Sequence, residues 1–225
     1  MNQFNAGNGS KRGDAPTGET PGRDSSNARS LLLEAGRRLF AQRGFRGTSI
    51  RGLTAEAGVN LGAVTYHFGS KEGLYHAVLD DCLGSVRDWV SAAGESPLPA
   101  MQRMEMVVRG LFHHLRENPD LPRFFVQEVV LGETMSPALL DFIRTVVGTL
   151  VRAMNEGQDE GSIVPGDPVL QVLSVLSQPI YLSVMPAALK REAGKGVALP
   201  LPTGSAEDHA VALLRRGLLR QEEKE

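Results

Sequence analysis

The chain has 225 residues, of which 41% are hydrophobic, and a net charge of −2, so it is long enough for a small domain plus a larger one. Its single cysteine, Cys82, excludes an intrachain disulfide and favours a reducing cytosol, so we expect a cytoplasmic location. We find no apolar run close to the ~20 residues that a membrane span needs, and we expect no membrane partner.

The charges are unevenly distributed along the chain. Residues 26–75 hold seven basic and three acidic residues, a charge of +4, whereas residues 76–225 have a charge of −6. A basic segment joined to an acidic body is typical of a module that binds a polyanion. Uneven surface charge without a function is the alternative.

The first 25 residues contain almost no large apolar side chain. Such a segment cannot bury enough surface to offset its ordering entropy, so we predict a disordered tail over residues 1–25. A helix is predicted to begin near Ser26 or Asn27, either of which can act as its cap. Gly44 is predicted to end that helix.

Two short helices joined by a glycine turn are predicted next. Thr48 can cap the first of them. In the turn, residues 57–60, Gly58 can take a positive φ without a Cβ clash. Asn60 can cap the second helix, which is predicted to run over residues 61–67.

The second helix has the features of a recognition helix. Val64 and Phe68 point inward and leave small and polar residues facing out, as entry into a major groove requires. Ser70 is predicted to cap the following helix, whose free N–H groups and Lys71 can hold a phosphate. The pattern favours a helix-turn-helix DNA reader over residues 49–68. An ordinary three-helix packing unit is the alternative.

After Lys71 the hydrophobic pattern stays helical to the end of the chain, and no period-two pattern persists. Breaks fall at residues 94–99, 118–119, 157–167 and 194–204. The fold class is therefore all-α. We predict an N-terminal three-helix helix-turn-helix DNA-binding domain over residues 26–75 and a C-terminal helical ligand-binding and dimerisation domain over residues 76–225.

The reader segment resembles the TetR family of bacterial regulators over about residues 28–75. The matching residues are Ala35, Leu39-Phe40, Gly44-Phe45, Thr48–Arg51, Ala57–Val59, Tyr66–Phe68 and Lys71–Leu74. Residues 60–74 further look like the CecR-type branch of that family.

The resemblance implies a homodimer with two readers on a palindromic double-stranded DNA operator. In the family, the residues matching Thr48, Tyr66 and Lys71 touch phosphates. Those that face the groove match Asn60, Leu61, Gly62, Ala63, Thr65 and His67. The chain departs from the family pattern twice: Thr54 stands where alanine is usual, and Thr65 where an aromatic residue is common. Thr65 could instead reach a base or a thymine methyl group.

The last two predicted helices carry long apolar stripes, which suit an isologous four-helix dimer interface. The candidate interface residues are Val172, Leu173, Leu176, Ile180, Leu213, Leu214, Gly217 and Leu218. The alternative is that these stripes only face the core of the monomer.

Aromatic and methionine side chains suit an adaptable cavity for a small apolar effector. The candidate pocket residues are Trp89, Met101, Met104, Phe112, Phe124, Phe125, Met135, Phe142, Met154, Tyr181 and Met185. For each of them a place in the core is the alternative.

Motifs of enzyme chemistry are not found: there is no G-x-S-x-G elbow, phosphate loop, dinucleotide fingerprint or H-E-x-x-H, so we predict neither an enzyme nor a cofactor. His113 and Glu117 lie one turn apart, but two ligands do not make a metal site. The prediction is a homodimeric repressor that a small apolar effector releases from a palindromic operator. The alternatives are an activator of the same fold, or a helical small-molecule-binding protein or enzyme without DNA affinity.

Overall fold

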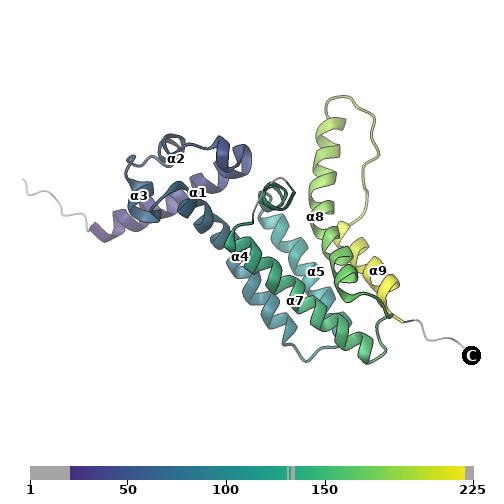
Figure 1. The fold of residues 1–225 in the computed structure, drawn as a ribbon. Coiled ribbons are helices and arrows are strands. Elements are labelled where there is room, and N and C mark those ends of the chain that lie inside the picture. Colours follow the sequence, from purple (N-terminus) through teal and green to yellow (C-terminus); the bar gives the residue numbers. More distant parts are fainter. Residues whose placement is uncertain (1–20, 131, 133–134, 221–225) are drawn as a thin grey trace, which may run out of the picture.

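The computed structural model describes residues 21–130, 132 and 135–220. Within them the chain forms nine α-helices and one π-helical turn, and its only β-type pairing is an isolated bridge between Ile163 and Leu219 (Figure 1). The all-α prediction is confirmed.

The first three helices form the compact N-terminal part of the molecule (Figure 1). They are α1 (Pro21–Gly47), α2 (Ile50–Ala57) and α3 (Ala63–Phe68), and α1 is interrupted at Gly44, whose φ is 70°. Residues 1–20 of the predicted tail lie outside the described residues, whereas its last five residues, 21–25, are helical. Pro21 explains the earlier start, because its fixed φ suits the first turn of a helix.

The remaining helices form an elongated bundle. They are α4 (Lys71–Gly94), α5 (Ala100–Glu117), α6 (Leu121–Phe125), the π-helical turn η1 (Val126–Val130), α7 (Pro137–Asp159), α8 (Pro168–Ala193) and α9 (Ala206–Leu218). Figure 1 shows α4 leaving the N-terminal part and running beside α7, with α8 and α9 on the far side of the bundle. A side-chain cap begins four of these helices: Ser70, which was predicted, and Ser136, Asp167 and Ser205 each accept a backbone N–H of the first turn.

Two apolar clusters hold the molecule together. The larger body cluster gathers α4, α5, α7, α8 and α9 around fully buried residues such as Met104 and Leu150. The second cluster joins α1, α2, α3 and the first half of α4, and it also includes Phe124 of α6 and Leu139 of α7. Packing therefore continues across residue 75, where the sequence suggested a division between two domains.

Helix α8 departs from the expectation that no segment is apolar enough to cross a membrane. By length and composition alone its 26 residues pass that test, and only 17% of its apolar window is buried. The expectation is wrong because uncharged serine and glutamine residues interrupt the apolar run without lowering its average greatly. A single helix of this kind also occurs in soluble proteins whose apolar face is covered by another surface.

Candidate functional site

The turn between α2 and α3 sets the orientation of the third helix. Gly58 adopts the left-handed conformation with a φ of 66°, and its N–H lies 3.3 Å from the carbonyl oxygen of Ala55. A side chain at this φ would be strained. The N–H of Val59 donates to the carbonyl of Thr54 at 3.0 Å, which closes the turn. The predicted glycine turn is confirmed.

Two predicted helix caps are wrong. Ser49 caps α2, since its hydroxyl accepts the N–H of Gly52 at 3.1 Å. Thr48 is buried instead, and its hydroxyl donates to the carbonyl of Gly44 at 2.8 Å. That hydroxyl cannot also reach a phosphate, so Thr48 leaves the set of DNA-contacting side chains. No side chain caps α3, and Asn60 is therefore not its cap.

The departure at Thr54 does not loosen the packing of the reader. Thr54 is 5% exposed, and its hydroxyl donates to the carbonyl of Ile50 at 3.1 Å within α2. A buried hydroxyl that finds a partner within its own helix carries little penalty.

The outer surface around α3 holds most of the predicted reading residues. Tyr66 is 78% exposed and Leu61 is 54% exposed, and His67 is half-buried. The exposed members of the predicted set are Asn60, Leu61, Gly62, Thr65 and Tyr66. Ala63 is only 6% exposed and packs in the same cluster as Val64, but it also lines the recess beside α3, so its place facing a groove stays a prediction.

The reading surface is hollowed. A recess of about 650 Å³ is lined by Ala28 of α1, by the turn residues Gly58 and Val59, and by residues of α3 that include Tyr66 and His67. The recess is lined mainly by apolar residues, and Asn60, Tyr66 and His67 are its polar members. This concave surface beside the exposed Tyr66 ring has a shape that a groove edge can occupy.

Lys71 is already engaged within the protein. Its ammonium group donates to the carbonyl of Phe45 at 2.9 Å and to that of Thr48 at 3.0 Å, and it lies 4.1 Å from the centre of the Phe45 ring. Phe45 lies in the last part of α1, after the interruption at Gly44, and Thr48 lies in the connection between α1 and α2. Lys71 therefore fixes that connection, which the sequence did not reveal, because the two carbonyls lie more than twenty residues away.

Other cations of the reader are free to meet an anion. Arg43, Arg46 and Arg51 are exposed and form no ion pair with the part of the chain that the structure describes. Arg38, in contrast, pairs with Glu34 at 2.9 Å and with a second carboxylate on α2. The sequence identified the basic segment as a whole, but only the pairing pattern separates the available cations from the neutralised ones.

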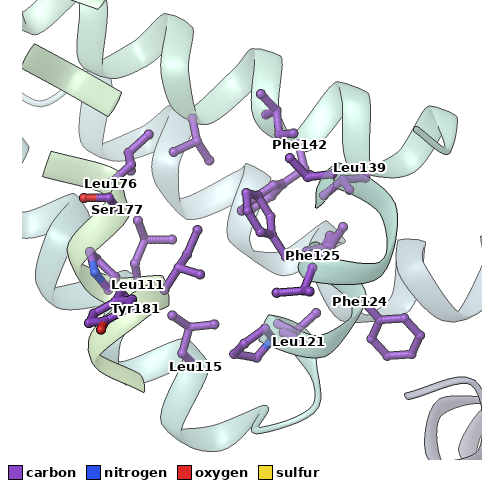
Figure 2. A pocket seen from close by; sticks show the side chains of 18 of the residues that line it. Leu111, Leu115, Leu121, Phe124, Phe125, Leu139, Phe142, Leu176, Ser177 and Tyr181 are labelled. Carbon is purple, nitrogen blue, oxygen red and sulfur yellow. The ribbon is translucent and has the colours of Figure 1, made fainter. Parts of the chain in front are cut away.

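A second site lies in the helical body. An apolar cavity of about 640 Å³, partly open to solvent, is lined by residues of α4, α5, α6, η1, α7 and α8. Figure 2 shows Leu176 and Tyr181 of α8 on one side of it, with Phe125 and Leu139 on the other. Of the predicted pocket residues, six line the cavity: Phe124, Phe125, Met135, Phe142, Tyr181 and Met185.

The other predicted pocket residues do not line the cavity. Met101, Met104, Phe112 and Met154 are buried in the body cluster, and Trp89 packs against it. Their hydrophobicity correctly predicted that they are interior residues. It does not indicate which side of each helix faces the cavity and which side faces a neighbouring helix.

The predicted dimer residues divide into three groups. Leu173, Leu176 and Ile180 line the cavity. Val172, Leu214 and Leu218 are buried in the monomer at 0%, 3% and 8% exposure, so they are not available to a partner and the prediction is wrong for them. Leu213 and Gly217 remain exposed on α9.

His114 is the cavity residue with the most complete hydrogen bonding. Its Nε2 lies 3.0 Å from the carbonyl oxygen of Cys82, and its Nδ1 lies 3.2 Å from the side-chain nitrogen of Asn118. Burial lowers the pKa of His114 and outweighs the opposing effect of the hydrogen bond to Cys82. The ring is therefore neutral at pH 7, donating from Nε2 and accepting at Nδ1. Cys82 is itself buried.

The π-helical turn η1 lies between the cavity and the reader. Val126, Val129 and Val130 line the cavity. The side-chain nitrogen of Gln127 reaches the carbonyl of Ala41 in α1 at 3.4 Å, and the buried Glu128 accepts a hydrogen bond from Tyr75. Adjacent residues of one turn thus contact the cavity and the DNA-reading part.

Comparison with known proteins places the N-terminal part in a family. Residues 32–78 match the family model described as "Bacterial regulatory proteins, tetR family". The chain is 35% identical over 82 residues to the HTH-type transcriptional repressor AcnR of Corynebacterium glutamicum, an alignment that covers 36% of this chain and 39% of the relative. The chain thus spans about two fifths of the length of that relative.

Longer similarities extend into the body. The HTH-type transcriptional repressor DhaR of Mycobacterium sp. (strain GP1) is 28% identical over 137 residues, 60% of this chain and 69% of the relative. A solved tetR-family regulatory protein from Rhodococcus superimposes with a TM-score of 0.67 over 87% of this chain and 98% of its own, at 22% identity. HlyIIR, a hemolysin II transcriptional regulator, gives a TM-score of 0.64 over 84% and 97%, at 17% identity.

The described residues thus combine an exposed helix-turn-helix with a helical body that contains an apolar cavity. Over residues 32–78 the chain matches the tetR family of bacterial regulatory proteins, and its fold is similar to that of a solved tetR-family protein. The CecR-type branch stays a prediction.

Proposed function

We propose that the chain is a homodimeric, cytoplasmic repressor that holds a near-palindromic operator until a small apolar molecule enters the cavity. The observation that carries this proposal is the exposed face of α3, where Tyr66 is 78% exposed beside the polar residues Asn60 and Thr65. A helix with its inner face buried and its outer face small, polar and aromatic is suited to a major groove.

The exposed side chains have distinct roles in this proposal. Thr65 and Leu61 face the bases, where a hydroxyl or an apolar contact with a thymine methyl group gives sequence preference. Tyr66 and the unpaired Arg51 contact phosphates, which fixes the register on the duplex without reading sequence. Asn60 and His67 flank the reading surface and supply further polar contacts.

The dimer is supported by the unusual exposure of α8 and α9. Leu170 is 63% exposed and Tyr181 is 58% exposed on α8, while Leu213 is 45% exposed on α9. Exposed apolar side chains on two neighbouring helices are typical of an interaction site. The small exposed residues Ser174 and Gly217 allow close approach of two helices. A twofold copy would cover this surface by an isologous contact.

A twofold dimer predicts the form of the operator. Two recognition helices related by a twofold axis enter successive major grooves, so the half-sites are inverted and about 34–36 Å apart. A molecule that binds the DNA-incompatible arrangement more tightly by about 1–3 kcal/mol lowers operator affinity roughly 5- to 150-fold. The cavity supplies the site for that molecule. Repression is supported by the names of the relatives AcnR and DhaR.

The experiment is selection of sequences from random duplexes by the full chain, with the mass of the complex measured by light scattering. We expect enrichment of one inverted repeat bound by two copies, from a chain that is purified without detergent. No enrichment would favour a helical binding protein without DNA affinity. A reporter under the selected operator gives the sign of regulation, since an increase on expression of the chain would indicate an activator.

A further inference from the structure

We propose that the cavity takes an uncharged molecule built mainly of hydrocarbon and rejects anions and cations of the same length. The proposal rests on the proposed function only in regarding that molecule as the effector. Binding itself is independent of DNA and can be measured alone.

The wall of the cavity carries no charge. None of its lining residues is Lys, Arg, Asp or Glu, and all but three are apolar. The three exceptions are His114, Ser177 and Tyr181. Its volume of about 640 Å³ lies in the range of sites for small organic ligands. Where it lies against the wall, a hydrocarbon ligand would replace water beside apolar side chains, which is favourable in proportion to the area buried.

His114 cannot serve as a counter-ion. Both ring nitrogens already have protein partners, Cys82 on one side and Asn118 on the other. Placing a proton on Nδ1 would turn it toward the amide nitrogen of Asn118, which is itself a donor. The oxygen of the Asn118 amide accepts a hydrogen bond from Arg37 at 2.8 Å, which holds the amide with its nitrogen toward His114.

The polar capacity of the cavity is confined to α8. Ser177 donates its proton to the carbonyl of Ser174 at 2.8 Å, so its oxygen keeps a free lone pair for a donor. Tyr181 lies one turn further on the same face and is 58% exposed. An alcohol, ketone or ester group can therefore be accommodated against α8, whereas the remaining wall is apolar apart from His114, whose ring nitrogens both have protein partners.

A charged ligand would be left without a partner. Transfer of an ionised carboxylate or ammonium into an apolar site is costly unless an opposite charge or several hydrogen bonds compensate it. The buried polar atoms that lack a partner in the described part of the chain belong to Arg103, Gln127 and Gln178, and none of these residues lines the cavity. Discrimination by charge therefore follows from the composition of the wall.

The test uses three probes with the same chain length: methyl dodecanoate, dodecanoate and dodecylammonium, each below its micelle concentration at pH 7.5. Dissociation constants for the full chain are measured by calorimetry, and the upward shift of the melting temperature gives a second readout. We expect the ester to bind at least tenfold more tightly than either ion. Equal or tighter binding of an ion would overturn the proposal, and so would binding of none of the three probes.

Two variants locate the binding. Val147→Phe places a larger side chain in the cavity wall and should weaken ester binding at least tenfold. Leu98→Phe adds the same kind of bulk at an exposed residue between α4 and α5, outside the wall, and should leave binding unchanged. Equal effects of the two variants would contradict this location.

The outcome is separable from that of the proposed function. If the chain binds the ester selectively but enriches no duplex, the proposed ligand class is supported and the proposed repressor function is rejected. If the chain enriches an inverted repeat but shows no preference among the three probes, the repressor function is supported and the ligand class is rejected.

Discussion

The guanidinium of Arg37 donates a hydrogen bond from Nη2 to Oδ1 of Asn118 at 2.8 Å. Arg37 belongs to α1 of the DNA-reading part, and Asn118 ends α5, directly after the turn that carries His114. Since His114 lines the cavity and bonds to Asn118, a continuous chain of polar contacts joins the cavity wall to the reader.

The first prediction concerns coupling through this chain. Asn118→Ala removes the link between Arg37 and His114, so the effect of methyl dodecanoate on operator affinity should decrease by about 0.5–2 kcal/mol. The measurement is the dissociation constant of the selected duplex with and without the ester. Arg37→Gln should give a similar loss, and the double variant little more than either single one, because both interrupt the same contact.

Asn155→Ala is the matched control, since Asn155 is exposed on α7. An unchanged ester effect in Asn118→Ala would show that coupling runs through apolar packing alone.

The second prediction concerns pH. Burial lowers the pKa of His114 in the folded protein, whereas the unfolded chain binds the proton near the ordinary value of about 6.5. Below that pH the unfolded state takes up more protons, so the free energy of unfolding is fully retained above about pH 6.5 and declines as the pH falls toward the folded-state pKa. His114→Gln should make the decline between pH 7.5 and 5.5 shallower in denaturant titrations.

His209→Gln serves as the control for this series, because His209 is exposed on α9. If both variants kept the slope of the natural chain, another group would be responsible for the pH dependence.

The third prediction concerns Lys71. Lys71→Met keeps the apolar stem but removes the donors to Phe45 and Thr48, so the free energy of unfolding should fall by about 1–3 kcal/mol. DNA affinity should fall with it, but the dependence of affinity on salt should not change. The sequence alone suggested a phosphate contact, for which the salt slope would decrease by about one unit.

Arg51→Gln provides the contrast. Arg51 is exposed and has no acidic partner in the described chain, so its loss should decrease the salt slope by about one unit and leave stability nearly unchanged. If the salt slope decreased for Lys71→Met and not for Arg51→Gln, Lys71 would be the residue that contacts a phosphate.

The fourth prediction tests the close approach of α4 and α5. A Cβ on Gly110 would lie 2.5 Å from the ring of Trp89, so Gly110→Ala should destabilise the protein by about 1–3 kcal/mol. At Gly148, inside α7, a Cβ would meet nothing within 4 Å, and Gly148→Ala should stabilise by about 0.5–1 kcal/mol. Thermal and urea unfolding would show the opposite signs, and a neutral Gly110→Ala would mean that Trp89 moves freely.

Local signals in the sequence predicted local structure well. The cap at Ser70 was predicted because a cap depends on a side chain and the two or three residues after it. Thr48 and Ser49 are both chemically suited to capping α2, and only the burial of Thr48 under α1 decides between them.

The sequence was much less informative about which face of a helix points into the core and which points to the cavity. Helix α8 is apolar almost all round, so its periodicity could not separate Val172 in the core from Leu173 beside the cavity. The hydrogen-bond acceptors of Lys71 could not be predicted for a different reason. Both are backbone carbonyl groups of a segment distant in sequence, and the positions of backbone groups cannot be read from composition or residue spacing.

The shared wall between the reader and the cavity has a consequence for protein engineering. Leu79, Leu83 and Phe124 belong to the same apolar cluster as the core of the helix-turn-helix, and all three line the cavity. A chimera joined at residue 75 would pack the helix-turn-helix core and this part of the cavity wall against side chains from another protein. Exchange of operator specificity between relatives is therefore better done by replacing only exposed α3 side chains such as Thr65 and Tyr66, which are not part of that cluster.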